Sequence, residues 1–393
     1  MSSTIAAVRA TPVNIPLDAP YRFSYGSIAS LTKTIVEVET LEGAVGLGEI
    51  ASGDMSAEVR RLADRLIGLD LLDLNEAERR CVPTMRSTPW GDVLGARRVF
   101  GGIELALWDA RGRIEGVSLA ALLGGAVRDR VALTEYFSYR LAGGRQPGES
   151  TPLEIARYCA RMVEQHGSGP FEGKVCTVGL AEEVELVREV RAAIGDERHL
   201  TLDANGGWTV PTAREALSRF EPYGIHYWED PVETPEELAR LRASTRASFS
   251  THVVDLERTI TLGAPDTIVT NLNELGGVRR TVEFIAACAR FDVGFRFHSG
   301  ETGIATAAYL QLSAACEHVR EPSQTLVRWY ADDVIAGGPF IPQHGSLPVP
   351  TGPGLGVELD RVALRRCHER YRAEGAFPAG VAGGGYGDSF RRS

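Results

Sequence analysis

The sequence has no long apolar run. No stretch approaches the roughly 20 apolar residues that a helix needs to cross a bilayer. The first residues, Met-Ser-Ser-Thr-Ile-Ala-Ala-Val-Arg, also lack the apolar core of a signal peptide. We therefore expect no membrane partner and a cytoplasmic location.

Cysteine pairs typical of zinc or redox sites are missing as well. The six cysteines are scattered without C-x-x-C spacing, which fits free thiols in a reducing compartment. No basic stretch offsets the net charge of −10, and this argues against nucleic acid as a partner. A small acidic substrate is not excluded, because a bound metal can override the overall charge locally.

The chain is long enough for two domains. With 393 residues it can bury one large core and a smaller one. Alternating polarity predicts strands over Ile5–Ile15 and Lys33–Thr40, and helical periodicity follows over 56–81 and 94–115. Strands followed by helices predict an α+β domain over residues 1–125. We expect residues from about 353 to 393 to return to this domain.

From about residue 126 to 352 the pattern changes to alternating strands and helices. The strand candidates are Val131–Ser138, Phe171–Cys176, Leu200–Ala204, His226–Glu229, Ser248–Val253, Thr267–Asn271, Val293–His298 and Thr325–Tyr330. Helical stretches such as Glu182–Ala193 and Arg279–Arg290 lie between them. Eight strands over about 200 residues predict an α/β fold of the (β/α)8-barrel type rather than a doubly wound sheet.

Polar residues stand at the ends of these predicted strands. Asp203 and Glu229 each end an apolar run, 26 positions apart, which is the length of one βα repeat. Acids at the ends of successive parallel strands converge on one rim of a barrel, and their oxygens suit Mg²⁺. The other strand ends carry Lys174, His252, Asn271 and His298. This set suits removal of a proton α to a carboxylate, which needs a metal and a base of tuned pKa.

Several motifs occur in an order that makes the chain resemble a known family. They are Phe-Gly-Gly-Ile-Glu-Leu-Ala-Leu-Trp-Asp-Ala-Arg-Gly (100–112), Leu-Thr-Leu-Asp-Ala-Asn-Gly-Gly-Trp (200–208), Trp-Glu-Asp-Pro (228–231), Asn-Glu-Leu-Gly-Gly-Val (273–278) and Gly-Pro-Gly-Leu-Gly-Val-Glu-Leu-Asp (352–360). The chain resembles the enolase superfamily in its mandelate racemase and muconate lactonizing enzyme branch, nearest to members like glucarate dehydratase. The resemblance implies a (β/α)7β barrel, a capping domain built from the N-terminal region and the C-terminal segment, and Mg²⁺ at the third, fourth and fifth strand ends.

The third metal ligand departs from the family's pattern. His252 matches the position at which members like glucarate dehydratase have Asn and many other members have Glu. Imidazole binds metals but is softer than Mg²⁺ prefers, so Mn²⁺ or another divalent ion is an alternative. Asp255 is a second candidate ligand, and a histidine that only lines the pocket is the third interpretation.

The predicted bases depart from the pattern too. Lys174 matches the second lysine of the family's Lys-x-Lys motif, but Glu172 replaces the first. An acid beside Lys174 should raise its pKa and suit it to stabilising charge. His298 matches the family's histidine and is our predicted general base. Asn271 replaces the aspartate that normally holds this ring, so the pKa of His298 should be lower than in a His–Asp pair.

Substrate-binding residues are predicted less specifically. Asn205 follows Asp203 by two positions and would face the same pocket. Tyr136 or Ser138 in the first strand and Arg328 or Tyr330 in the eighth fit substrate binding or packing equally well. In the cap, Arg22, Phe23 and Tyr25 lie where the family lowers a loop over the substrate, and their composition fits an anionic ligand.

The resemblance implies a Mg²⁺-dependent lyase that dehydrates a sugar acid. His298 or Lys174 would remove the α-proton, the metal would stabilise the enediolate, and the β-hydroxyl would leave. One alternative is a racemase or epimerase of a carboxylate or amino-acid derivative, with Lys174 and His298 on opposite faces. Another is a barrel that binds a ligand without catalysis, because Glu172, His252 and Asn271 are altered. We expect a small carboxylate substrate and a homo-oligomer.

Overall fold

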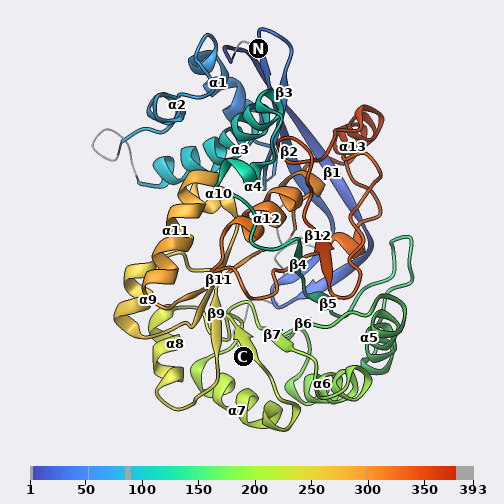
Figure 1. Ribbon diagram of the computed structural model, residues 1–393. Coiled ribbons are helices and arrows are strands. Elements are labelled where there is room, and N and C mark those ends of the chain that lie inside the picture. The colour runs from blue at the N-terminus through green and yellow to red at the C-terminus, as the bar shows by residue number, and fades with distance from the viewer. Residues whose placement is uncertain (1–2, 52, 85–89, 299, 378–393) are drawn as a thin grey trace.

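The structure, a computed structural model, describes residues 3–51, 53–84, 90–298 and 300–377. Antiparallel strands with helices beside them form one end of the molecule, and a curled parallel sheet ringed by helices forms the other (Figure 1). In the part of the chain described, no helix combines the length and apolar character needed to span a membrane.

The cap is built from the N-terminal elements. Its sheet has the order β1-β2-β3, and its helices are α1 to α4. The bounds are β1 Ile5–Phe23, β2 Gly26–Thr40, β3 Val45–Ile50, α1 Ser56–Leu66, α2 Leu74–Cys81, α3 Trp90–Glu115 and α4 Leu119–Leu122. The predicted strands are therefore confirmed, and both are longer than their alternating stretches.

Two glycines let strand β3 lie directly on helix α3. A Cβ atom on Gly46 would be 2.0 Å from the carbonyl oxygen of Ala106, and one on Gly48 would be 2.0 Å from that of Gly102. Any side chain at these positions would force the strand away from the helix. The glycine-rich stretch after residue 42 therefore reflects close packing inside the cap.

Seven parallel strands form the curled sheet of the barrel, in the order β11-β10-β9-β8-β7-β6-β5. The strands are β5 Glu135–Phe137, β6 Phe171–Lys174, β7 Leu200–Asp203, β8 Tyr227–Glu229, β9 Phe249–Thr251, β10 Thr267–Thr270 and β11 Gly294–Phe297. The helices around them are α5 Pro152–His166, α6 Leu180–Ile194, α7 Val210–Phe220, α8 Pro235–Arg242, α9 Leu256–Leu262, α10 Leu272–Leu275, α11 Val278–Arg290 and α12 Gly303–Ala315, with a short 3-10 helix η1 at Glu221–Tyr223. The predicted α/β barrel with a cap is confirmed.

Two predicted strands differ from the structure. Val131–Ser138 is divided into β4 (Arg130–Ala132), which pairs with β12 (Ser346–Pro348), and β5 in the barrel. Thr325–Tyr330 is not a strand, because it contains the 3-10 helix η2 (Val327–Trp329). A short apolar run does not distinguish a strand from a buried turn, and here the Thr325 hydroxyl accepts the N–H of Val327 and favours the turn.

The residues just before η2 close the barrel instead. The N–H of Ser323 donates to the carbonyl of Ala132, and the N–H of Thr134 donates to the carbonyl of Ser323. On the other side, the N–H of Gln324 donates to the carbonyl of Phe297 at the end of β11. This short segment therefore joins the first and last parts of the curled sheet.

Helix α13 (Arg361–Glu374) brings the C-terminal segment back to the cap. The Nδ1 atom of His368 lies 2.8 Å from the carbonyl oxygen of Pro12, and Arg370 donates to the carbonyl of Asn14 at 3.0 Å. The helix therefore packs along β1, as Figure 1 shows. Residues 378–393 of the predicted C-terminal return lie outside the described part of the chain.

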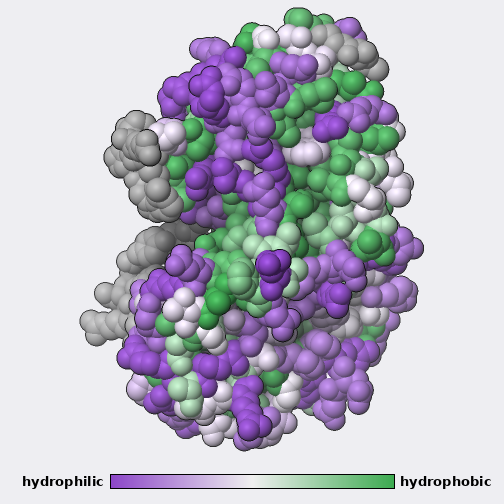
Figure 2. All heavy atoms as spheres, turned by 60° about the vertical axis from the view of Figure 1, so that its left-hand side comes forward, coloured by the Kyte–Doolittle hydropathy of each residue, from purple (hydrophilic) through white to green (hydrophobic). Residues whose placement is uncertain are grey.

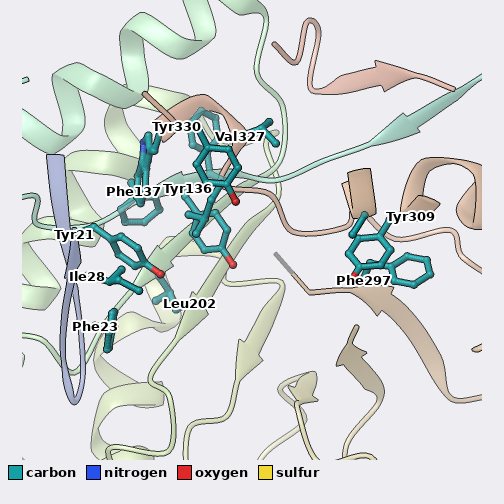
Figure 3. Packing of buried hydrophobic residues seen from close by; sticks show 14 of the residues in the cluster. Tyr21, Phe23, Ile28, Tyr136, Phe137, Leu202, Phe297, Tyr309, Val327 and Tyr330 are labelled. Carbon is teal, nitrogen blue, oxygen red and sulfur yellow. The ribbon is translucent and has the colours of Figure 1, made fainter. Parts of the chain in front are cut away.

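One apolar core extends from the cap into the barrel. Tyr21 and Ile28 of the cap lie in the same buried cluster as Tyr136 and Phe137 of the barrel (Figure 3). On the face seen in Figure 2, hydrophilic side chains cover much of the lower half, and hydrophobic residues gather where the upper and lower halves meet. The two parts therefore share buried surface next to the barrel's rim.

Buried Asp109 of α3 joins three segments of the chain. Its carboxylate accepts the N–H of Leu47 in β3 at 2.7 Å and that of Leu355 at 2.6 Å, and it also accepts from Nε of Arg113 at 2.8 Å. A buried carboxylate with these partners cannot be replaced by an apolar side chain without leaving donors unpaired.

We expect Asp109→Ala to lower the free energy of unfolding by about 3–5 kcal/mol, because it leaves a partly buried guanidinium and two backbone N–H groups without their acceptor. The measurement is urea unfolding followed by circular dichroism. Glu317→Ala is the matched control, since its exposed pair with Arg320 contributes under about 1 kcal/mol. Equal losses for the two variants would contradict this role of Asp109.

Candidate active site

Three buried carboxylates meet at the rim of the barrel. In the sheet register Asp203 of β7 pairs with Lys174 of β6 on one side and with Glu229 of β8 on the other. Asp203, Glu229 and Glu172 are fully buried, and one oxygen atom from each lies within 4.8 Å of the others. The structure therefore brings together the two carboxylates that the strand spacing predicted, and adds Glu172 to them.

The donors beside Asp203 and Glu229 suit a divalent cation. Asn205 donates to Asp203 through its backbone N–H at 2.8 Å and its side-chain amide at 2.7 Å. The buried Oδ1 atom of Asn205 has no hydrogen-bond partner among the described residues. Hard oxygen donors in this number fit Mg²⁺, and buried acids in such proximity require a compensating cation.

His252 lies where the third ligand was predicted. Its Nδ1 atom is 2.6 Å from Asp230 Oδ2, and its Nε2 atom is 3.6 Å from Glu229 Oε1. A carboxylate that holds one ring nitrogen while the other faces the metal is typical of histidine ligands. Burial alone would lower the pKa of His252, but Glu229 and Asp230 raise it to about 9, so metal binding would release a proton.

Asp255, the second candidate for the third ligand, has a different role in the structure. Its side chain is the N-cap of α9 and accepts the N–H of Arg258 at 3.0 Å. It is exposed, and it does not belong to the buried carboxylate group. The structure therefore favours His252 over Asp255 beside Glu229.

Lys174 forms an ion pair with Asp203. Burial alone would lower its pKa, but Asp203, followed by Tyr136, Tyr21 and Glu172, raises it well above the usual value. The predicted effect of Glu172 on Lys174 is confirmed in direction, although Asp203 has the larger effect. Lys174 is therefore an ammonium group that can stabilise negative charge.

Arg296 of β11 is the site residue that the sequence reasoning missed. Its guanidinium reaches Glu172 at 3.0 Å and Glu229 at 2.5 Å, and Gln324 donates to the same two carboxylates at 2.6 Å and 2.8 Å. Arg296 thus supplies a positive charge beside the glutamate that replaces the family's lysine. Its position two residues before His298 was the available signal, because alternate strand residues point to the same side.

Three partners of the buried carboxylates, Lys174, Asn205 and His252, line one cavity of about 470 Å³ between the cap and the barrel. Eight of the predicted site residues line it, namely Phe23, Tyr25, Tyr136, Lys174, Asn205, His252, Asn271 and His298. The cap contributes mainly aromatic and aliphatic side chains, including Tyr21, Phe23 and Ile28. The cavity therefore has a polar floor in the barrel and a largely apolar wall in the cap.

Two predicted substrate-binding residues do not line this cavity. Arg22 stands between Tyr21 and Phe23, which do, and successive strand residues point to opposite faces. Arg328 lies in η2, where its Nε atom is 2.7 Å and 2.8 Å from the two oxygens of Glu135. Arg328 contacts Glu135 because its segment turns instead of continuing as a strand.

Ser138 and Tyr330, the alternatives to Tyr136 and Arg328 as substrate-binding residues, also have hydrogen-bond partners in the fold. Ser138 donates its hydroxyl to the carbonyl of Arg22 at 2.5 Å, and Tyr330 donates its own to the carbonyl of Glu301 at 2.8 Å. These bonds connect the cap to the barrel and η2 to the segment after His298. Neither residue lines the cavity.

His298 faces the cavity next to His252, with their ring centres 4.8 Å apart. Burial, followed by the charges of His252, Lys174 and Lys33, lowers its pKa well below the usual value. The predicted partner Asn271 uses its side-chain oxygen to cap α10, where it accepts the N–H groups of Asn273 and Glu274 at 3.1 Å. The ring is therefore neutral, because partial burial and the neighbouring cations disfavour its protonated form.

Comparisons with known proteins agree with this geometry. Residues 5–124 match the family model for the N-terminal domain of the mandelate racemase/muconate lactonizing enzymes, and residues 154–363 match the enolase C-terminal domain-like model. The chain therefore belongs to the mandelate racemase/muconate lactonizing enzyme family of the enolase superfamily, and it is an enzyme.

Three relatives illustrate the similarity. A probable glucarate dehydratase from Streptomyces coelicolor is 29% identical, over 94% of this chain and 92% of its own. A D-galactonate dehydratase from Xanthomonas oryzae pv. oryzae is 30% identical, over 85% of this chain and 90% of its own. An enolase structure from Pseudomonas fluorescens with bound magnesium, potassium and tartrate has a TM-score of 0.88 at 26% identity, covering 95% of this chain and 94% of its own.

We expect Arg296→Met to lower the free energy of unfolding by about 3–5 kcal/mol, because it leaves Glu172 and Glu229 buried without their cation. Thermal and urea unfolding measure the loss. Adding Glu172→Met to this variant should restore part of the stability, since it removes one uncompensated charge.

The control is Arg320→Met, which removes an exposed guanidinium and should change stability by under about 1 kcal/mol. If Arg296→Met were as stable as the wild type, the guanidinium would not be the charge that holds these carboxylates together.

Proposed function

We propose that this enzyme is a Mg²⁺-dependent hydro-lyase that dehydrates a sugar acid. The observation that carries the proposal is that neutral His298 lines the same cavity as His252 and Lys174, which lie beside the buried carboxylates Glu229 and Asp203. The names of the relatives support the same class, because two of them are dehydratases of sugar acids. The bound magnesium and tartrate of the Pseudomonas structure support a carboxylate ligand with a metal.

Asp203, Glu229 and His252 would hold the metal. When bound, Mg²⁺ would bind the substrate's carboxylate and reduce the cost of the negative charge that develops as the α-proton leaves. His298 is neutral, so its free ring nitrogen can accept that proton. The C–H electrons form the new double bond, the C–O bond of the β-hydroxyl breaks, and His298 returns its proton so that water leaves.

The remaining groups of the cavity support this proton transfer. The Lys174 ammonium lies at the same rim and stabilises negative charge on the substrate. Asn205 positions Asp203 through two hydrogen bonds. Tyr136, whose ring centre is 5.1 Å from Lys174 Nζ, forms part of the wall beside it.

Dehydration fits this site better than epimerisation. Epimerisation needs a base on each face of the α-carbon, and Lys174 would have to act as the second. The Asp203 carboxylate raises the pKa of Lys174 well above its usual value, which keeps it protonated. A protonated Lys174 serves charge stabilisation, whereas a single neutral base suffices for loss of water.

The test is a panel of aldonic and aldaric acids incubated with enzyme and Mg²⁺ in D₂O. We expect a 2-keto-3-deoxy acid to form from at least one substrate, with none formed when the metal is chelated. His298→Asn should lower kcat by about 1,000-fold, because it removes the general base. Asp203→Asn should abolish metal-dependent turnover.

His318→Asn is the matched control, because this histidine donates its Nε2–H to the carbonyl of Val293 and does not line the cavity. Deuterium exchange with inversion and no loss of water would replace the dehydratase by an epimerase. Near-full activity of His298→Asn would show that another group is the base.

A further inference from the structure

Lysine is almost absent from this chain. Of its 42 basic Lys and Arg residues only Lys33 and Lys174 are lysines, and the other 40 are arginines. Both lysines line the same cavity. Lysine offers a compact ammonium with freely rotating donors, whereas arginine offers a broad planar fork. The chain therefore uses lysine at the two places where a cation faces the cavity from a strand, and arginine at every other basic position.

Lys33 is a buried cation that forms no ion pair with the part of the chain that the structure describes. It lies on β2 of the cap, opposite Val13 in the register, and its side chain is only 6% exposed. Its Nζ atom donates to the carbonyl of Ala51 at 2.6 Å. Within the described residues, no carboxylate oxygen lies within 4.0 Å of it. An ammonium has three donors and is costly to bury alone, so the remaining donors require an acceptor.

The groups around Lys33 indicate that this acceptor would lie in the cavity. Its charge acts on both His298 and Glu301, which line the cavity from the segment that follows β11. Burial raises the pKa of Glu301 to about 7, and Glu49 adds to this effect while Lys33 opposes it. Near neutral pH, Glu301 is thus partly protonated. Its carboxylate then neutralises the positive charge of Lys33 only in part, and the protonated form of Glu301 can donate a hydrogen bond.

We propose that Lys33 binds a second carboxylate at the far end of the substrate, so that the sugar acid dehydrated here is a diacid. This inference rests on the proposed function, in which the first carboxylate lies at the metal site of the barrel. The two lysines then have separate roles. Lys174 lies beside the end of the substrate that reacts, and Lys33 of the cap binds the carboxylate at the other end. An aldonic acid would place a neutral hydroxyl group at Lys33 and leave the buried ammonium unpaired.

The experiment compares kcat/KM for an aldaric acid and for the aldonic acid of the same configuration. We expect the wild-type enzyme to prefer the diacid by about 100-fold, since losing one partner of a buried charge pair has an effect of this order. In Lys33→Met the ratio should fall by about 30-fold or more, mainly through a higher KM for the diacid. Lys33→Arg should retain part of the preference because it keeps the charge.

Arg22→Met is the matched control. This variant removes a cation from the neighbouring strand of the cap, and the Arg22 side chain does not line the cavity. The ratio of kcat/KM for the two acids should therefore stay at the wild-type value. A wild-type enzyme that prefers aldonic acids would overturn the proposal. So would a Lys33→Met variant that loses activity equally on both acids, since that pattern indicates a structural role.

Calorimetry separates this inference from the proposed function. In a His298→Asn background with Mg²⁺, binding of the diacid should weaken by about 30-fold when Lys33→Met is added. Unchanged affinity overturns the role of Lys33 even if the enzyme proves to be a dehydratase. A Lys33-dependent affinity, combined with no loss of water when the wild-type enzyme acts on the same diacid, would instead uphold the diacid site and reject dehydration. Thermal unfolding of each variant confirms that it is folded.

Discussion

The repulsion among buried carboxylates at the barrel rim is the constraint on which the site depends. Glu172, Asp203 and Glu229 offer oxygens within 4.8 Å of one another, and all three are excluded from solvent. Two unit charges 4 Å apart interact by about 4 kcal/mol near a protein surface, so such a group needs cations. Arg296 and Lys174 supply them from two different strands.

Those two cations contact different carboxylates of the rim. Arg296, together with Gln324, contacts Glu172 and Glu229, whereas Lys174 pairs with Asp203. Glu229 lies beside His252 and Asp203 beside Lys174, and both of these partners line the cavity, from which a divalent ion can join the two carboxylates. The substitution of glutamate for the family's lysine is thus compensated inside the barrel, and the altered motif does not by itself remove the metal site.

The cap turns this rim into a substrate site. Glu49 of β3 accepts the N–H of Thr302 at 2.9 Å and that of Ala305 at 3.1 Å, which fixes the cap to the start of α12. Tyr21 and Phe23 cover the barrel's mouth, and Lys33 brings a charge from the same sheet. One end of a small acid would therefore contact the rim of the barrel, and the other end would contact the cap.

Local patterns in the sequence predicted the parts of this arrangement that recur at a regular spacing along the chain, such as the ends of successive strands. The spacing of Asp203 and Glu229 gave one βα repeat and one rim, and the structure places both there. Long-range pairing was not predictable in the same way. Arg296 meets Glu172 across 124 positions, and only the folded barrel brings them together.

The structure departs from the expected arrangement where one residue of phase or one turn decides which way a side chain points. Arg22 was assigned to the pocket with its neighbours, although alternation along β1 turns it away. Arg328 was placed in an eighth strand that is a 3-10 helix. The role of Asn271 as a helix cap also has no signal beyond a common N-cap residue type.

The most direct test of this account is an anomalous-scattering map of crystals grown with Mn²⁺, an ion that accepts both oxygen and imidazole ligands. The account predicts one manganese peak bound by Asp203, Glu229 and Nε2 of His252, with Glu172 still paired to Arg296. A peak bound by Glu172, or saturating Mn²⁺ without any peak at the rim, would contradict it.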